Sequence, residues 1–457
     1  MPVAIGLQFS AGSLIPADAP SNAVIGIVGT SALGAINTPI TVKNLTEAIA
    51  AFGYPTTGST IPDALNRAYK SYGQITFVGV NVAAPAQIAV VAVEYTFNAQ
   101  DRIQLPHRHI TTPIVTNQAG TTTYVLNTDY TINLVMGLIQ RKGSAIPANS
   151  IVKVGYSRPD FAAVTSAMVV GGVNVGTGKR EGLDALIDAE LVNLNAANIT
   201  DIICPGYSQI QTVATKMAEL ATRLRSQYYL DAPASATVAE VLAGRTASAA
   251  PVAHFATQDE RAILCYPNAI VSGVEEWLSN HVAFARAIAT PEIAPTNLEF
   301  KGVTSWKTIL LTSSSDDLAD NAKLVNVGVV TYLSRPGQNP VLWGHFNASY
   351  PQVNVMFKNF DRIHIVRIRD MVIDAIELRL SSLVARSLGM RNPAAIAAIE
   401  SLASQVANSV RGVEASKLIF LPLASDLALN KLAFRLEIRA ANVLDLISFD
   451  FLFIAGV

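Results

Sequence analysis

Four consecutive segments near the start of the chain decide its fold: AVIGIVGT (residues 23–30), LTEAIAAFG (45–53), IPDALNRAYKSYG (61–73) and QITFVGVNV (74–82). The first and last are apolar runs of strand length, and the middle two carry apolar residues at helical spacing. Thr46 is the expected N-cap of the first helix and Gly53 its stop, while Pro62 and Asp63 open the second helix. The order strand, helix, helix, strand predicts an α/β core.

This alternation stops near Pro85 and resumes at about residue 160. Between these points, short β-rich runs such as IAVVAVEYTF and TTTYVLNTDYTINL are broken by Gly, Asn and Pro, with hardly any helical period. The alternation then returns with helices expected in EGLDALIDAELVNLN, QIQTVATKMAELATRLRSQY and EEWLSNHVAFARAIA, and with strands in TDIICPG and AILCYPNAI. We therefore predict one α/β core domain, residues 23–84 with 160–331, interrupted by an all-β insertion domain, residues 85–159.

A last α+β domain is predicted over residues 332–457. It contains a long amphipathic helix, roughly 361–388, and a second helix at about 392–410. Two alternating strands, KLAFRLEIR (431–439) and SFDFLFI (448–454), close the chain, and Phe449, Phe451 and Phe453 share one face of the second strand. The predicted fold class is therefore α/β and α+β multidomain, with extended N- and C-terminal arms.

The first ten residues, MPVAIGLQFS, have the period of a strand with one buried face, since Val3, Ile5, Leu7 and Phe9 alternate with small or polar residues. The next segment contains Pro16 and Pro20 and does not continue a sheet, so residues 1–22 are read as an arm and linker. From Ala11 to Asn22 the linker can extend to about 40 Å, which is enough to reach an adjacent subunit. The pattern alone leaves two partners equally open, the chain's own sheet and that of a neighbour.

The composition favours a protein that associates with itself. Half of the 457 residues are hydrophobic and 15% are charged, well below the roughly 25% of an average soluble protein. The net charge is −1 with no long run of like charge, which argues against a nucleic-acid partner and a polybasic membrane surface. The chain has no apolar run long enough to span a bilayer, and no signal peptide is expected. Cys204 and Cys265 lie in apolar surroundings and are expected to be buried, reduced thiols.

No catalytic, cofactor or metal motif is complete. GGVNVGTGKREG lacks the first glycine and the hydroxyl residue of a phosphate-binding P-loop, and the segment around Ser31 breaks the Gly-x-Ser-x-Gly pattern of a nucleophile elbow. His107 and His109 are two residues apart and could share a strand face, but no third ligand lies close in sequence. We therefore expect no catalytic residue, no cofactor and no metal; a hydrolase that uses Ser31 is kept as the alternative of a different class.

Several segments resemble contractile tail sheath proteins in the order expected for that family. The block from VIGIVGTSALG to FVGVNV resembles the family's N-terminal signature, and TTTYVLNTDYTINL to GYSRPD is similar to the accessory β-domain of many phage sheaths. VGGVNVGTGKREGLDALIDAE, NLEFKGVTSW and LVNVGVVTYLSRPGQNPVLWGHFNAS resemble the later parts, with Val341-Leu342-Trp343-Gly344 the sharpest match. His345 departs from the pattern, since sheaths often carry a small residue or Arg there.

The resemblance implies a structural subunit that forms stacked hexameric rings in a helical sheath around an inner tail tube. Such sheaths are loaded by a baseplate, end at tail terminator proteins and contract to drive the tube through the target envelope. The implied location is the virion, with assembly in the host cytoplasm, no nucleic-acid partner and no membrane insertion. A bacteriocin-like or secretion-type injection machine is the nearer alternative.

The resemblance also implies strand exchange between subunits, in which the chain ends add strands to a neighbour's C-terminal sheet. It favours exchange for the first strand and assigns the same role to the strand of Phe449, Phe451 and Phe453. The C-terminal domain is expected to face the tube. There Lys358, Arg362 and Arg369 form a basic stripe at spacings of four and seven, for which a solvated face and a contact with an acidic tube surface are equally open.

Overall fold

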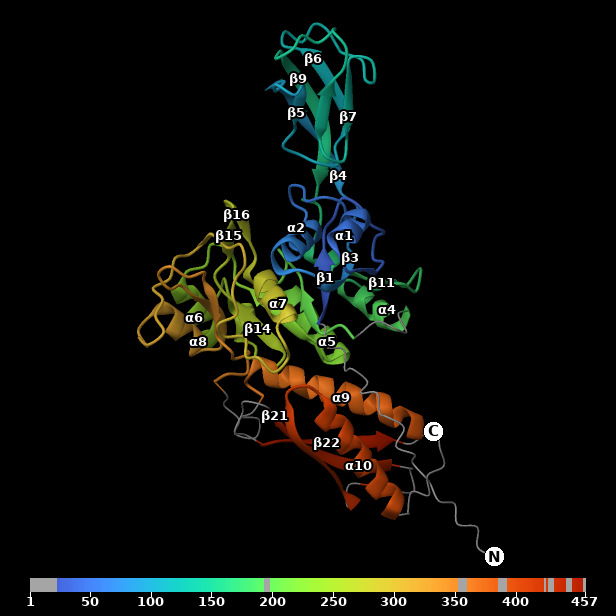
Figure 1. Cartoon of the computed structure of the whole chain (residues 1–457), viewed down its shortest axis with the longest axis vertical. Helices are drawn as coiled ribbons and strands as arrows, with labels where there is room; N and C mark the ends of the chain where they lie inside the picture. The colour runs from blue at the N-terminus through green and yellow to red at the C-terminus, as the bar shows by residue number, and fades with distance from the viewer. Residues whose placement is uncertain are drawn as a thin grey trace, which may run out of the picture. The chain divides into compact units, whose positions relative to one another are not determined.

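The computed structural model describes residues 23–192, 198–351, 360–384, 393–422, 425, 431–440 and 446–454 (Figure 1). These residues form two compact units. The larger unit contains residues 23–289 and 295–363, and the smaller contains residues 290–294 and those from 364 onwards. The predicted division at residue 332 falls inside a strand of the larger unit, so the structure divides the chain about thirty residues later, between Ile363 and His364.

The larger unit is built on an eight-stranded sheet in the order β19-β18-β14-β13-β12-β1-β3-β2. The six inner strands are parallel, and the two edge strands, β2 and β19, are antiparallel to their neighbours. The bounds are β1 Val24–Gly29, β2 Ile40–Val42, β3 Thr76–Asn81, β12 Asp201–Ile203, β13 Gln227–Asp231, β14 Ala262–Cys265, β18 Val329–Leu333 and β19 Val341–Trp343. The α/β prediction for this part of the chain is confirmed.

Helices pack against this sheet as the alternation requires. Their bounds are α1 Leu45–Phe52, α2 Ile61–Arg67, α3 Ser166–Val170, α4 Ala185–Val192, α5 Gln211–Leu224, α6 Val238–Ala247, α7 Leu278–Ile288 and α8 Asp320–Val325. A π-helical turn, Ala68–Tyr72, follows α2, and 3₁₀ turns occur at Gly182–Asp184 and Ala253–Ala256. Short hairpin strands complete the unit: β10 Gly172–Val173, β11 Arg180–Glu181, β15 Ala269–Val271, β16 Val274–Glu276 and β17 Ser305–Trp306.

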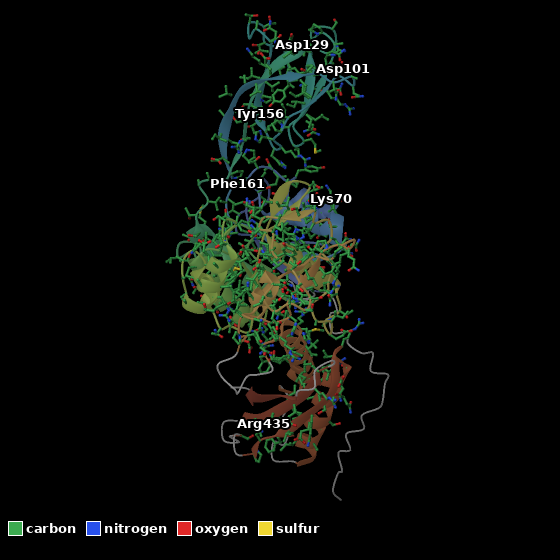
Figure 2. The ribbon with its side chains drawn as sticks, turned by 90° about the vertical axis from the view of Figure 1, so that its left-hand side faces the viewer. Lys70, Asp101, Asp129, Tyr156, Phe161 and Arg435 are labelled. Carbon is green, nitrogen blue, oxygen red and sulfur yellow. The ribbon has the colours of Figure 1, made fainter. Side chains whose placement is uncertain are left out.

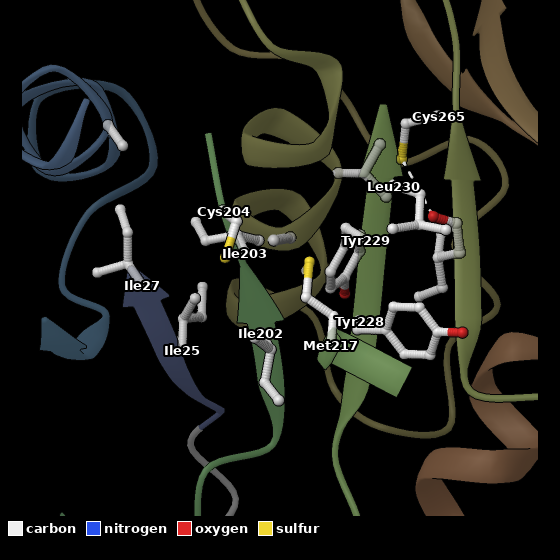
Figure 3. Packing of buried hydrophobic residues seen from close by; sticks show 14 of the residues in the cluster. Ile25, Ile27, Ile202, Ile203, Cys204, Met217, Tyr228, Tyr229, Leu230 and Cys265 are labelled. Atoms are coloured by element: carbon white, nitrogen blue, oxygen red, sulfur yellow. Dashed lines mark hydrogen bonds between the residues drawn. The ribbon is translucent and has the colours of Figure 1, made fainter. Parts of the chain in front are cut away.

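The core lies between the sheet and its helices. Figure 3 shows side chains from this core, among them Ile25 and Ile27 of β1, Ile202 and Ile203 of β12 and Met217 of α5. All five side chains are fully buried. Since a parallel sheet is covered on both faces, its strands read as continuous apolar runs, which is the pattern that identified β1, β3, β12 and β14 in the sequence. Cys204 and Cys265 belong to the same core and are buried, as predicted.

Three details of the helices differ from the prediction. The N-cap of α1 is Asn44, whose Oδ1 accepts the Glu47 N–H, and not Thr46, whereas Gly53 ends the helix as expected. The helix predicted over residues 209–228 ends at Leu224, because Arg225 adopts a left-handed conformation. The residues that follow form the buried strand β13, of which Gln227 and Tyr228 had been predicted as the end of the helix, and α6 was not predicted.

Between β3 and α3 the described chain contains only strands. Their bounds are β4 Ala86–Thr96, β5 Arg102–Gln104, β6 Thr111–Asn117, β7 Tyr130–Asn133, β8 Leu138–Arg141 and β9 Ile151–Asp160. They form two antiparallel sheets, β4-β9-β6 and β5-β8-β7, and enclose their own cluster of buried residues, which includes Phe97, Val115, Ile139 and Val152. Asp101 and Tyr156 mark this β-rich segment in Figure 2.

The smaller unit contains two helices and a three-stranded sheet. Helix α9 is Ile363–Val384 and α10 is Pro393–Ser409, close to the predicted bounds. The strands are β20 Val413–Phe420, β21 Lys431–Ala440 and β22 Leu446–Ile454, in the order β20-β21-β22. Strands β21 and β22 lie where two strands were predicted, whereas β20 was not predicted. No helix in the described ranges is long and apolar enough to cross a membrane.

Candidate functional site

The three-stranded sheet of the smaller unit is the candidate site, because strand exchange requires a sheet with a free edge. Its central strand, β21, shows the predicted alternation, since Phe434, Leu436 and Ile438 are buried while Arg435 and Arg439 are exposed. Figure 2 labels Arg435 on this strand. Helix α10 contributes the buried residues Ile399, Ala403 and Ala407 at spacings of four. One face of the sheet is therefore covered, and the two outer strands decide where another strand can add.

The edge formed by β20 is occupied by side chains of α10. The backbone N–H of Leu418 donates to Ser404 Oγ at 3.0 Å, and that of Phe420 donates to Glu400 Oε1 at 2.6 Å. The Ser416 hydroxyl donates to the Ser404 carbonyl oxygen at 2.9 Å. These residues alternate along β20, so their backbone N–H groups point away from β21. Two outward donors of this edge, the N–H groups of Leu418 and Phe420, are therefore already paired.

The edge formed by β22 is different. In the antiparallel register, Phe449 pairs with Leu436 and Phe451 with Phe434. The backbone of Ala433 bonds towards β20, through the Leu421 N–H, so the next residue, Phe434, bonds towards β22. By the same alternation, the backbone groups of Ser448, Asp450 and Leu452 face away from β21. Within the described ranges, no strand pairs with this side of β22.

The strand-exchange residues predicted from the sequence are placed only in part. Val3, Ile5, Leu7 and Phe9 lie outside the described residues. Phe449, Phe451 and Phe453 belong to β22, which pairs with β21 of the same chain over nine residue pairs from Lys431–Ile454 to Arg439–Leu446. The structure therefore differs from the expectation of a free C-terminal arm. In the single chain β22 completes the sheet of the same chain, because β21, the apolar strand that precedes it in sequence, is available to pair with it.

The basic stripe expected on the long helix is not present as one exposed surface. Lys358 lies outside the described residues, and Arg362 is half-buried and precedes the first residue of α9. Arg369 is 8% exposed, and its Nε lies 3.1 Å from Asp370 Oδ1. The first half of α9 is buried on nearly every side, from Ile363 to Val372. The prediction is wrong for Arg369, since its guanidinium is used inside the fold.

Ser31 is not placed as a nucleophile. The residue is fully buried, its N–H donates to Asn81 Oδ1 at 3.1 Å, and its hydroxyl donates to the carbonyl oxygen of Leu33. A nucleophile instead needs an adjacent base and access to substrate. The side chain fixes the turn that follows β1.

A buried Ser–Asp–His group, missed in the sequence, also has a structural geometry. The Asp231 carboxylate accepts bonds from Ser208 Oγ at 2.8 Å, Ser279 Oγ at 2.6 Å and the Ser279 N–H at 2.9 Å. His254 Nε2 lies 2.8 Å from the carbonyl oxygen of Asp231 and not from its carboxylate, so the His is not aligned by the acid as in a catalytic triad. The carboxylate instead caps the first turn of α7. Burial raises the pKa of Asp231 to about 6.

His107 and His109 have separate partners. His107 Nδ1 lies 2.7 Å from the Tyr156 hydroxyl, whereas His109 Nε2 accepts the Tyr54 N–H at 2.8 Å. Burial, followed by the nearby Arg108, lowers the pKa of His109, which favours the neutral ring that can accept this bond. Throughout the part of the chain that the structure describes, no group of three or more His, Cys, Asp or Glu residues could hold a metal ion. The glycine-rich segment forms the hairpin of β10 and β11.

Known proteins similar to this chain are tail sheath proteins. A tail sheath protein of Burkholderia phage BcepMu is 33% identical over 364 residues, which cover 76% of this chain and 74% of the phage protein. A prophage major tail sheath protein of Pseudomonas aeruginosa is 28% identical over 241 residues, covering 50% of this chain and 56% of that protein. No family model matches the chain.

Solved structures with a similar fold extend over nearly the whole chain. A sheath tail protein from Desulfitobacterium hafniense matches with a TM-score of 0.59 at 11% identity, covering 98% of this chain and all of that one. The helical sheath of the anti-feeding prophage in its contracted state matches with a TM-score of 0.52 at 10% identity, covering 93% and 91%. At these identities the match shows a shared fold.

Proposed function

Because this chain belongs to the family of phage tail sheath proteins, we propose that it is the structural subunit of a contractile tail sheath. Subunits stack as hexameric rings in a helix around an inner tube, and contraction drives the tube through the envelope of the target cell. The observation that carries this proposal is the 33% identity to a phage tail sheath protein over three quarters of the chain. The sequence resemblance to this family is thereby confirmed.

Strand exchange between subunits joins the rings. The segment of Val3, Ile5, Leu7 and Phe9 supplies the donated strand, and burying these four side chains would contribute about 1.5–3 kcal/mol each before entropic costs. The strand of Phe449, Phe451 and Phe453, first expected to be a second donated arm, serves instead as the acceptor edge of the sheet. Two observations support this acceptor role: β22 pairs with β21 of the same chain, and among the described residues no further strand pairs with the other side of β22. Many such weak contacts in one polymer give a strong assembly.

The β-rich segment of residues 85–159 serves as an outward-facing insertion domain, supported by its separate hydrophobic cluster. The C-terminal unit faces the tube, and Lys358 and Arg362 are the basic residues proposed to lie near it. Further partners are the baseplate and the tail terminator. The burial and bonding of Ser31 argue against the hydrolase alternative. The sheath acts in the virion and assembles in the host cytoplasm.

Electron microscopy of the purified full-length protein tests the assembly. We expect tubes or stacked rings of uniform diameter, because every subunit carries both the donated strand and the acceptor sheet. A chain that stays monomeric at high concentration, alone and with its tube protein, would contradict the sheath function.

Deletion of residues 1–20 tests the strand exchange. The truncated chain should keep the circular-dichroism spectrum and cooperative unfolding of the full chain but form no tubes, since it lacks the donated strand. Loss of folding would show instead that the first strand belongs to its own chain's sheet. Replacing Gln8 by Ser is a matched control that leaves the apolar face of the arm intact and should still assemble.

A second candidate is the sheath of a phage-derived injection machine, which the match to the anti-feeding prophage sheath favours. The two differ in whether the tail carries a DNA-filled head. Mass spectrometry of native particles that contain this chain separates them, because capsid proteins accompany the sheath only in a phage.

A further inference from the structure

The spacing of acceptor side chains along helix α10 matches the spacing of outward N–H groups along strand β20. Glu400 and Ser404 are one helical turn apart, about 6 Å along the axis. Leu418 and Phe420 are two strand residues apart, which is about 6.8 Å. The contacts run antiparallel, with Glu400 on Phe420 and Ser404 on Leu418, so consecutive outward N–H groups of the strand meet consecutive acceptors of the helix.

The close approach of the helix is set by small residues. Ala403 and Ala407 are fully buried on the side of α10 that packs inwards, and Glu400 and Ser404 are half-buried at the border of that side. A side chain larger than Ala at these two positions would push the helix away from the sheet. Packing therefore holds the two acceptors within hydrogen-bond distance of the strand edge.

We propose that Glu400 and Ser404 seal the β20 edge, so that a strand from a neighbouring subunit adds to this sheet only along β22. An added strand needs free N–H groups on the edge that receives it, and those of Leu418 and Phe420 are already bonded. This inference rests on the proposed strand exchange. Its consequence is one acceptor edge for each subunit, which gives the assembly a single connectivity and prevents branching.

Hydrogen exchange measured by mass spectrometry on the full-length, unassembled chain tests the seal itself. In Glu400→Ala/Ser404→Ala, the amides of residues 416–421 should exchange about tenfold faster or more, since two hydrogen bonds at the edge are lost. Glu400→Gln keeps an acceptor oxygen and should retain most of the protection. Ser401→Ala/Gln405→Ala alters exposed positions on the same helix and should exchange like the wild type. Equal exchange in all four chains would overturn the proposal.

Photo-crosslinking tests the selectivity of the two edges. The probe is a synthetic peptide of residues 1–12 that carries a photoreactive group, added to the dilute full-length chain. In the wild type it should crosslink to β22, and in Glu400→Ala/Ser404→Ala to both β20 and β22. Crosslinks to β20 in the wild type, or crosslinks to β22 alone in the double variant, would overturn the seal.

The two tests separate the seal from the strand exchange on which it rests. If the peptide crosslinks to neither edge of either chain, strand exchange fails and selectivity for β22 fails with it, while the hydrogen-exchange result still reports whether α10 protects the β20 amides.

Discussion

At the scale of single residues, buried polar side chains fix the connections between elements of the larger unit. Asp231 at the end of β13 holds the start of α7 through Ser279, and it also bonds Ser208 in the loop after β12. Arg286 of α7 bonds Gln227 and Tyr229 of β13, and the Tyr229 hydroxyl donates to Asp201 at the start of β12. The clustering of acid, hydroxyl and guanidinium groups resembles an active site. Their hydrogen bonds, however, are made to other groups of the fold, so we assign them a structural role.

Asp231→Asn should reduce the pH dependence of stability between pH 4 and 6. Burial raises the native pKa of Asp231 to about 6, above the value of about 3.9 in an unfolded chain. The native state therefore binds the proton more tightly, and this contribution to stability is present below pH 4 and is lost as the pH rises through 6. Because the carboxyl is fully buried, the free energy of unfolding should fall by about 3 kcal/mol in total as the pH rises through this range. The neutral amide of Asp231→Asn does not titrate and should not contribute this change.

Urea unfolding of the wild type and of Asp231→Asn at several pH values from 4 to 7 measures this difference. Asp63, whose pKa is raised to about 6 chiefly by burial, contributes in the same direction and remains in the variant. Parallel stability curves for the two chains would contradict the assignment.

Arg245→Met should destabilise the larger unit by about 3 kcal/mol or more. Arg245 is 4% exposed, and its guanidinium donates to five backbone carbonyl oxygens, those of Phe255, Thr257, Val327, Ala348 and Tyr350. Methionine fills a similar volume but leaves these buried acceptors without a donor. Urea denaturation measures the loss, with the exposed Arg335→Met as the control that should change stability little. If Arg245→Met unfolds at the same urea concentration as the wild type, water must replace the guanidinium as the donor to these carbonyl oxygens.

At the scale of elements, close packing overrides local preference. Gly244 lies inside α6, where glycine is disfavoured, yet a Cβ at this position would lie 2.6 Å from both Cβ and the carbonyl oxygen of Val252. The helix thus approaches the following turn more closely than any other residue type allows. A similar constraint operates at Gly53, whose Cβ would lie 2.6 Å from Nε2 of His109.

Gly244→Ala should lower the free energy of unfolding by about 1–3 kcal/mol, since the overlap with Val252 costs more than the roughly 1 kcal/mol that alanine adds to helix stability. Thermal unfolding of the variant and of Thr246→Ala, an exposed position of the same helix, provides the comparison. A stabilised Gly244→Ala chain would mean that α6 moves to accommodate the methyl group.

At the scale of the whole molecule, the larger unit has two separate hydrophobic clusters. One surrounds the eight-stranded sheet, and the other lies within residues 97–156. The contacts between the β-rich segment and the α1–α2 loop include polar and ring contacts: His109 accepts the Tyr54 N–H, Thr56 donates to the Arg108 carbonyl oxygen, and the Arg108 guanidinium lies 5.3 Å from the Tyr54 ring centroid. This arrangement predicts that the segment is dispensable for folding of the sheet.

A chain in which residues 86–160 are replaced by a short Gly-Ser linker should therefore fold and unfold cooperatively. We expect a loss of about 1–2 kcal/mol from the bond to the Tyr54 N–H, and an isolated 86–160 fragment that folds by itself. Circular dichroism and urea unfolding of both pieces check this. If the chain that lacks residues 86–160 shows no cooperative transition, the β-rich segment and the eight-stranded sheet share one core.

Much of the fold was predictable because it depends on local periodicity. The apolar runs around Ile25 and Phe77, the helical spacing of α9 and α10 and the alternation of Phe434 and Leu436 each reflect one buried face, and burial repeats with the period of the element. The predicted boundary at residue 332 was wrong because β18 and β19 are too short to show to which sheet they belong. Strand β13 was missed because YYLD directly follows a helix without a turn residue.

The sequence by itself therefore determined the class of each long element, their order and the family to which the chain belongs. Only the tertiary structure decided which strand edges can accept another strand and which charged side chains are exposed. Arg369 reads as a surface charge but is buried in the fold, and the N–H groups of Leu418 and Phe420 in β20 are bonded by side chains of the helix that precedes this strand. The physical reason is that burial and hydrogen-bond partners depend on contacts across the fold, which no local pattern encodes.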